Sequence, residues 1–147
     1  MADLDIMDSD SIWIVQGNSS LLDPSTNILL TSNFYMFEYF DNFVIIKEVY
    51  RKANYLPLTS KLWGIWMPKL GLIFNEAFIW QRRRDLTGVK FRCGSLPTAP
   101  HIYLEPINGT KYQKIDGAVG DVWNELENTM KFSSKIELAI VGKNRMK

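Results

Sequence analysis

The sequence predicts an α/β fold, and three features of residues 82–141 carry that prediction. Asn108 and Gly109 separate the runs at 101–107 and 110–115, and the Asn-Gly pair is the strongest short-range signal for a β-hairpin. Directly after the second run, apolar residues recur at the spacing of an amphipathic helix. Alternating apolar residues before the hairpin and after the helix predict two further strands. This order of strand, hairpin, helix and strand is typical of the first half of an α/β lobe.

The composition is that of a globular protein. Of the 147 residues 46% are apolar and 22% are charged, which is enough for one domain or for parts of two. The net charge of +1 gives no bias toward nucleic acid, but the charges are unevenly spread. Residues 1–46 hold seven acidic residues and no Lys or Arg, and residues 47–147 hold 17 basic and nine acidic residues. This break favours two structural units. One domain whose acidic face packs on its basic face is the alternative.

Five apolar runs predict strands in the first half of the chain. The run SIWIV at 11–15 ends at a Gly-Asn turn. The run NFYMFEYF at 33–40 is rich in aromatic residues that favour strands, with a helix as the alternative because short apolar runs are ambiguous. FVIIKEVY at 43–50 predicts a strand buried on both faces at its start. KLWGIW at 61–66 and GLIF at 71–74 predict two short strands.

Two glycines and two tryptophans stand out in these last strands. Gly64 and Gly71 indicate a bend or a close approach of backbones. Trp63 and Trp66 are interpreted as packing residues, with a ligand cage as the alternative.

The most charged window, residues 81–85, predicts the boundary between residues 1–81 and 82–147. Its three consecutive arginines are interpreted as a solvated linker, because the aromatic residues and further basic stripe of a nucleic-acid platform are missing. No nucleic-acid partner is therefore expected.

The second half of the chain gives clearer patterns. Residues 89–96 alternate like a strand that stops at Pro97. The predicted hairpin strands are 101–107 and 110–115. Asp116 is placed to cap the following helix, because its carboxylate can accept the free amides of the first turn. The last strand is expected at 135–141. The helix is expected to carry one apolar stripe of Val119, Val122, Trp123, Leu126 and Met130, and an ion pair between Glu127 and Lys131.

No motif in the sequence supports catalysis. Phosphate-binding loops, dinucleotide fingerprints, HExxH and CxxC are all missing, and the single His101 has no evident acid–base partner. The single Cys93 excludes an internal disulfide and favours a small buried residue. We therefore predict a protein that is not an enzyme and that holds no metal and no cofactor. The acidic N-terminus lacks the pattern of a signal peptide, and the longest nearly apolar stretch is too interrupted to predict a membrane span.

Three stretches carry a resemblance to a known family. They are the lead-in and first strand RRRDLTGVKFRCGSLPTAP, the helix and strand in DGAVGDVWNELENTMKF and KIELAIVG, and the upstream segment IIKEVYRKANYLPLTSKLWGIWMPKLGLIF. Their order, over roughly residues 43–141, resembles the end of the amino-terminal domain and the start of the ligand-binding domain of ionotropic glutamate receptors. Within that family the chain looks like the insect chemosensory ionotropic receptors.

The resemblance implies a finer fold and a function. Residues 1–81 would be the C-terminal part of an amino-terminal domain, and 82–147 the incomplete first part of lobe 1 of a periplasmic-binding-protein-like ligand-binding domain. The chain would be a fragment of a chemosensory (olfactory) ligand-gated cation channel subunit, on the extracellular side of the cell membrane in the full-length parent. Implied partners are a small acid, amine or amino acid as ligand and other receptor subunits. The alternative is a soluble non-enzymatic binding or interaction module with a partial periplasmic-binding-type lobe.

The resemblance also assigns site residues. Asp85 stands where the family usually has Asn, and Thr98 stands where it often has an acidic residue. The arginine that grips a ligand carboxylate is expected beyond Lys147, and a ligand-contacting aromatic position falls near Met146. The loop from Thr98 to His101 is therefore the cleft-facing part, with Thr98 and His101 as candidate ligand-binding residues.

Two sequons offer candidate glycosylation sites. Asn18 begins Asn-Ser-Ser and Asn108 begins Asn-Gly-Thr, and both matter only if the chain is secreted. For Asn108, the role in the hairpin turn is the simpler interpretation.

Overall fold

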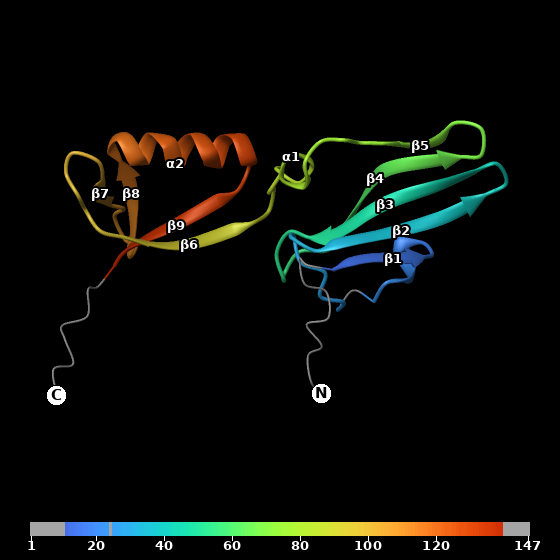
Figure 1. The fold of residues 1–147 in the computed structure, drawn as a ribbon. Coiled ribbons are helices and arrows are strands. Elements are labelled where there is room, and N and C mark those ends of the chain that lie inside the picture. Colours follow the sequence, from blue (N-terminus) through green and yellow to red (C-terminus); the bar gives the residue numbers. More distant parts are fainter. Residues whose placement is uncertain (1–10, 24, 140–147) are drawn as a thin grey trace, which may run out of the picture. The chain divides into compact units, whose positions relative to one another are not determined.

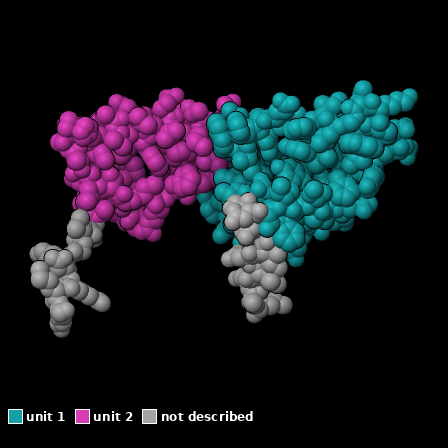
Figure 2. Space-filling view, in the orientation of Figure 1, with its two compact units in different colours: residues 1–83 teal, residues 84–147 magenta. Residues whose placement is uncertain are grey.

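The computed structural model describes residues 11–23 and 25–139, and the chain divides into two compact units (Figures 1 and 2). Unit 1 runs to Arg83 and unit 2 begins at Arg84. The structure is mixed α/β with two mixed sheets, so the predicted α/β class is confirmed in its general form. The predictions for Met146 and for the end of the last strand lie outside the described residues.

Unit 1 is a five-stranded sheet in the order β1-β2-β3-β4-β5 (Figure 1). The strands are β1 (Ile12–Gln16), β2 (Asn33–Phe40), β3 (Phe43–Arg51), β4 (Leu58–Met67) and β5 (Gly71–Phe74). β1 runs parallel to β2, and the remaining neighbours are antiparallel. A 3-10 helix, η1 (Ser19–Leu21), follows β1, and a single helical turn, α1 (Ile79–Arg82), follows β5. The aromatic run at 33–40 is therefore a strand and not the alternative helix.

The core of unit 1 lies on one face of this sheet. It consists of the buried residues Ile28, Phe34, Met36 and Val49, with Trp13, Val15, Leu22 and Leu58 packed against them. The connection from β1 to β2 supplies Leu22 and Ile28, and the Arg51 amide donates to the Ile28 carbonyl over 2.8 Å. The prediction that β3 is buried on both faces at its start is wrong. Phe43 is exposed and the buried residues are Glu48, Val49 and Tyr50, because the β1–β2 connection packs against the far end of the strand.

A bulge interrupts the pairing of β3 with β4. Ile46 lies opposite Gly64 and Lys47 lies opposite Leu62, so Trp63 is the extra residue on β4. The predicted close approach at Gly64 is confirmed, since a Cβ atom there would lie 2.9 Å from the Phe74 Cβ and 3.0 Å from the Ile73 carbonyl oxygen.

Unit 2 is a four-stranded sheet in the order β6-β9-β8-β7 (Figure 1). The strands are β6 (Lys90–Ser95), β7 (Tyr103–Pro106), β8 (Tyr112–Asp116) and β9 (Ser133–Leu138), and the helix α2 (Gly117–Met130) connects β8 to β9. β6 and β9 are parallel, while β7 with β8 and β8 with β9 are antiparallel. The predicted hairpin is confirmed.

Arg92 and Lys111 both pair with Glu137 and lower the pKa of that carboxyl, chiefly through the Arg92 hydrogen bond.

The helix begins as predicted, at the Asp116 cap, whose carboxylate accepts from the Gly117 amide over 2.8 Å. Its orientation differs from the prediction. The side that packs on the sheet contains buried Gly120 and half-buried Trp123, whose indole donates to the Ser134 hydroxyl over 2.9 Å. The ion pair of Glu127 with Lys131 is not formed, and the Glu127 Oε1 is buried without a hydrogen-bond partner among the described residues.

Only part of the predicted apolar stripe of α2 is therefore buried. Trp123 and Met130 are half-buried, but Val119, Val122 and Leu126 are exposed, between 41% and 61%. The stripe follows from spacing alone, and spacing does not say which side of it the sheet covers.

We expect Lys131→Gly to stabilise unit 2. Lys131 ends α2 with φ 59 and ψ 34, a left-handed conformation that costs a residue with a Cβ about 1–2 kcal/mol. Glycine removes that cost but gains entropy in the unfolded chain, so the net gain is about 0.5–1 kcal/mol. Urea unfolding followed by the circular dichroism of α2 measures it. Asn124→Gly, at an exposed position inside the same helix, is the control and should destabilise by a few tenths of a kcal/mol. A loss of stability with Lys131→Gly would contradict the prediction.

Candidate functional site

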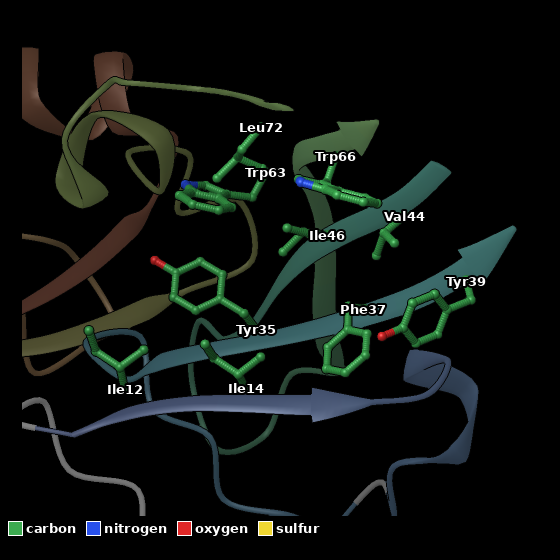
Figure 3. A pocket seen from close by; sticks show the side chains of 10 residues that line it. All are labelled: Ile12, Ile14, Tyr35, Phe37, Tyr39, Val44, Ile46, Trp63, Trp66 and Leu72. Carbon is green, nitrogen blue, oxygen red and sulfur yellow. The ribbon is translucent and has the colours of Figure 1, made fainter. Parts of the chain in front are cut away.

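An apolar depression lies on the sheet face of unit 1 that is opposite the core (Figure 3). We call this surface the apolar face. Its volume is about 650 Å³, within the range of small-molecule pockets. Ten side chains from all five strands line it: Ile12, Ile14, Tyr35, Phe37, Tyr39, Val44, Ile46, Trp63, Trp66 and Leu72.

The relief of the apolar face follows from the alternation of side chains along each strand. Tyr35, Phe37 and Tyr39 form an aromatic row on β2, while Phe34 and Met36 point to the core. Trp63 and Trp66 form a second aromatic row on β4 (Figure 3). β3 lies between β2 and β4 and contributes only Val44 and Ile46, which are smaller. The result is an aliphatic trough along β3 with aromatic walls.

The aromatic walls are held together by ring contacts. The Tyr35 and Trp63 ring centroids are 5.0 Å apart across β3, and Trp63 and Phe74 are 4.9 Å apart. Phe37 and Tyr39 meet edge to face at 5.4 Å. Such pairs contribute about 0.5–1.5 kcal/mol beyond the burial of their area. The ring contacts therefore stabilise the positions of the aromatic side chains on this face. The prediction of Trp63 and Trp66 as packing residues is therefore correct for Trp63, whereas Trp66 is 42% exposed.

The chemistry of the apolar face is that of a binding surface. None of its ten side chains is charged, and its polar groups are the hydroxyls of Tyr35 and Tyr39 and the indole nitrogens of Trp63 and Trp66. It holds no acid–base pair and no nucleophile with an activating base. What it can offer to another molecule is the burial of apolar and aromatic surface.

A buried ion cluster also lies in unit 1, at the Glu48 end of β3. Arg82 donates to the Glu48 Oε2 from Nε over 3.1 Å and from Nη2 over 2.9 Å. Arg83 lies 3.5 Å from the same oxygen, donates to the Ser32 carbonyl over 3.0 Å, and stacks on the Tyr50 ring at 4.4 Å. The side chains of Arg83 and Glu48 are each 2% exposed.

The interpretation of the three arginines as a solvated linker is therefore wrong for Arg82 and Arg83, and of the three only Arg84 is exposed. Burial lowers the pKa of Arg83, and the nearby Glu48 carboxylate opposes that change. The prediction failed because Glu48 and Arg82 are separated by 34 positions in the sequence. The available signal was Glu48, the single acidic residue in a strand that is otherwise mainly apolar, since a buried carboxylate needs a cation.

The structure brings Thr98 and His101 together in one exposed turn of unit 2. The Thr98 carbonyl accepts from the His101 amide over 2.8 Å and from the Ile102 amide over 2.9 Å. The His101 carbonyl accepts from the Val119 amide over 3.0 Å, which fixes the turn to the first turn of α2. Both residues are exposed. They lie in unit 2, whereas the large apolar depression lies in unit 1.

The two sequons differ in their local structure. Asn108 is exposed in the turn between β7 and β8, where Gly109 has φ 74. Asn18 is also exposed, but its side-chain oxygen accepts from the Ser20 amide over 3.0 Å and caps η1.

The remaining sequence predictions concern groups that the structure does not assemble into a site. Cys93 is half-buried. Within residues 11–23 and 25–139 there is no group of three or more His, Cys, Asp or Glu side chains that could hold a metal ion. In the same part of the chain no helix has the length and hydropathy that crossing a membrane requires.

The apolar face is the feature that the sequence interpretation missed. Its signal was present, because in the run at 33–40 both alternating sets of residues are mainly apolar. Such a run predicts a strand buried on both faces. The structure covers one of these faces with the core and leaves apolar residues exposed on the other. Comparison with known protein families and with curated proteins finds no match for this chain.

Proposed function

We propose that the chain is part of the extracellular ligand-binding region of a chemosensory ligand-gated cation channel subunit of the ionotropic glutamate receptor-like type. The observation that supports this most is the topology of unit 2. A first strand, a hairpin, a helix and a second strand follow the arginine-rich segment in the order that the resemblance implies, and the first and last strands are parallel neighbours. In this proposal unit 2 is the start of a ligand-binding lobe and unit 1 the end of the preceding domain.

The position of the Thr98–His101 turn fits this proposal. In α/β sheets, ligands bind outside the carboxyl ends of the parallel strands. β6 ends at Ser95 beside the end of β9, where the Ala139 amide donates to the Ser95 carbonyl over 2.8 Å. The turn leaves the sheet at that edge and is fixed to the start of α2. Thr98 and His101 would therefore lie at the rim of a ligand cleft whose other residues come from outside this chain.

The proposal predicts that this chain alone binds the ligand poorly. Its cleft would have only the Thr98–His101 turn, without a cation to pair with a ligand carboxylate. We expect no binding tighter than about 1 mM for amino acids, amines or carboxylic acids, which corresponds to about 4 kcal/mol of binding free energy. Titration of the isotope-labelled 147-residue chain, followed by amide chemical shifts, measures this. Submillimolar binding at the turn would contradict the assignment of the missing contacts to other segments.

Sequencing of full-length transcripts tests the function itself. We expect the reading frame to continue past Lys147 into an arginine-bearing second part of the lobe and into apolar helices of about 20 residues each, the length that spans a bilayer. A stop codon directly after Lys147 in every transcript would exclude the channel subunit.

A second candidate function has its own support. The apolar face of unit 1 would suit a soluble binding or interaction module, because a patch of uncharged aromatic and aliphatic side chains marks an interaction surface. The same transcript data separate the two candidates, since only the module is compatible with a chain that ends without pore helices.

A further inference from the structure

We propose that the apolar face is an interface between two copies of this chain. The inference depends on unit 1 alone and does not require the channel function. It starts from the exposure of the surface, because five of the ten lining side chains are between 41% and 70% exposed: Ile12, Ile14, Tyr39, Trp66 and Leu72.

The available area is that of a stable dimer. Aromatic side chains present about 150–250 Å² each when fully exposed, and large aliphatic ones somewhat less. With the exposures above, the five exposed side chains leave roughly 500 Å² accessible and the five half-buried ones roughly 200 Å² more, which is close to the about 800 Å² that each partner contributes to an interface of standard size. The lining residues carry no charge, and homodimer interfaces are the most apolar class of protein interface.

The shape of the apolar face allows it to pack against a second copy of the same face. The aromatic row on β2 stands beside the aliphatic trough along β3 (Figure 3). In a two-fold dimer each surface meets its own copy, so a ridge and a trough that lie side by side can fill each other reciprocally. Phe37 and Tyr39 of one copy would enter the trough over Val44 and Ile46 of the other, beyond the end of the trough that the contact of Tyr35 with Trp63 closes. Two sheets packed face to face at about 10 Å separation allow such interdigitation.

The test is the mass of the 147-residue chain in solution, measured by light scattering and by sedimentation from about 0.1 to 100 µM, because interfaces of this size have dissociation constants in the micromolar range or below. We expect a concentration-dependent dimer with twice the 17.0 kDa of the chain. Ile14→Lys is expected to raise the dissociation constant at least about tenfold, because it places a charge in the buried apolar surface. Tyr39→Lys is a second variant with the same expectation, and circular dichroism reports whether each variant is folded.

Leu62→Lys is the matched control. Leu62 is 59% exposed on β4, close to the 68% of Ile14, but it lies opposite Lys47 in the register, on the core side of the sheet. It should leave the dissociation constant within about twofold, as expected for a residue outside the interface. A monomer throughout the concentration range would overturn the proposal and leave the apolar face to an occupant of another kind. A folded Ile14→Lys variant that dimerises like the unaltered chain, or a Leu62→Lys variant that weakens the dimer equally, would also overturn it.

Discussion

Replacing Glu48 with glutamine is expected to destabilise unit 1 by about 3–5 kcal/mol, the usual cost of removing one partner of a buried ion pair. The Glu48 Oε2 accepts from both Arg82 and Arg83, and the Glu48 and Arg83 side chains are almost completely buried. Glutamine keeps the shape of the side chain and one oxygen acceptor. The loss of stability therefore measures the cost of leaving the Arg82 and Arg83 guanidinium charges without a carboxylate partner. Urea unfolding followed by tryptophan fluorescence reports on unit 1, which holds four of the five tryptophans.

Glu38→Gln is the control for this experiment. Glu38 pairs with Lys47 over 2.6 Å in the same sheet, but the Lys47 and Glu38 side chains are 28% and 16% exposed, so solvent screens the pair. The expected cost is about 1 kcal/mol or less. If Glu48→Gln costs no more than Glu38→Gln, the buried cluster does not stabilise unit 1. Combining Glu48→Gln with Arg83→Met should cost less than the sum of the two single changes, because the double variant no longer buries the Arg83 charge.

Gly117→Ala is expected to destabilise unit 2 by about 3 kcal/mol, the sum of a conformational cost and a steric one. Gly117 has φ 83, a conformation that costs a residue with a Cβ about 1–2 kcal/mol. Its Cβ would also lie 2.8 Å from the His101 carbonyl oxygen and 3.1 Å from the Pro100 carbonyl oxygen, and backbone atoms cannot move away as a flexible side chain could. The circular dichroism of α2 during urea unfolding measures the loss.

Gly109→Ala separates the two causes. Gly109 has φ 74, close to that of Gly117, but no atom lies within 4 Å of the position of its Cβ. It should therefore show the conformational cost alone, about 1–2 kcal/mol. Equal losses of unfolding free energy at the two glycines would contradict this prediction. They would mean that the Thr98–His101 turn moves away from the new methyl group, so that its carbonyls do not constrain the start of α2.

The parts of the fold that could be predicted are those fixed by neighbours in the sequence. The hairpin follows from Asn108-Gly109, and the start of α2 follows from the Asp116 cap, because in both cases the groups that decide the structure are only a few residues apart. The strand at 33–40 follows from its composition.

The parts that could not be predicted depend on which face of an element is covered. Of the stripe that spacing predicts on α2, Val119, Val122 and Leu126 are exposed, and the side that packs on the sheet is centred on Trp123 and Gly120. The fate of Arg82 and Arg83 depends on Glu48, far away along the chain. For the candidate site, the proximity of Thr98 and His101 was implied by the sequence, whereas the attachment of their turn to α2 required the structure.

The extra residue in β4 has a consequence for spectroscopy. Trp63 and Trp66 are three positions apart, so in a regular strand they would lie on opposite sides of the sheet. The bulge at Trp63 shifts the alternation by one and places both indoles on the apolar face. Deleting one residue of the β4 bulge would restore the regular alternation, and Trp63 and Trp66 would then lie on opposite faces of the sheet. The two indoles form one optical probe of that surface, and their emission would shift together to shorter wavelengths when water leaves it.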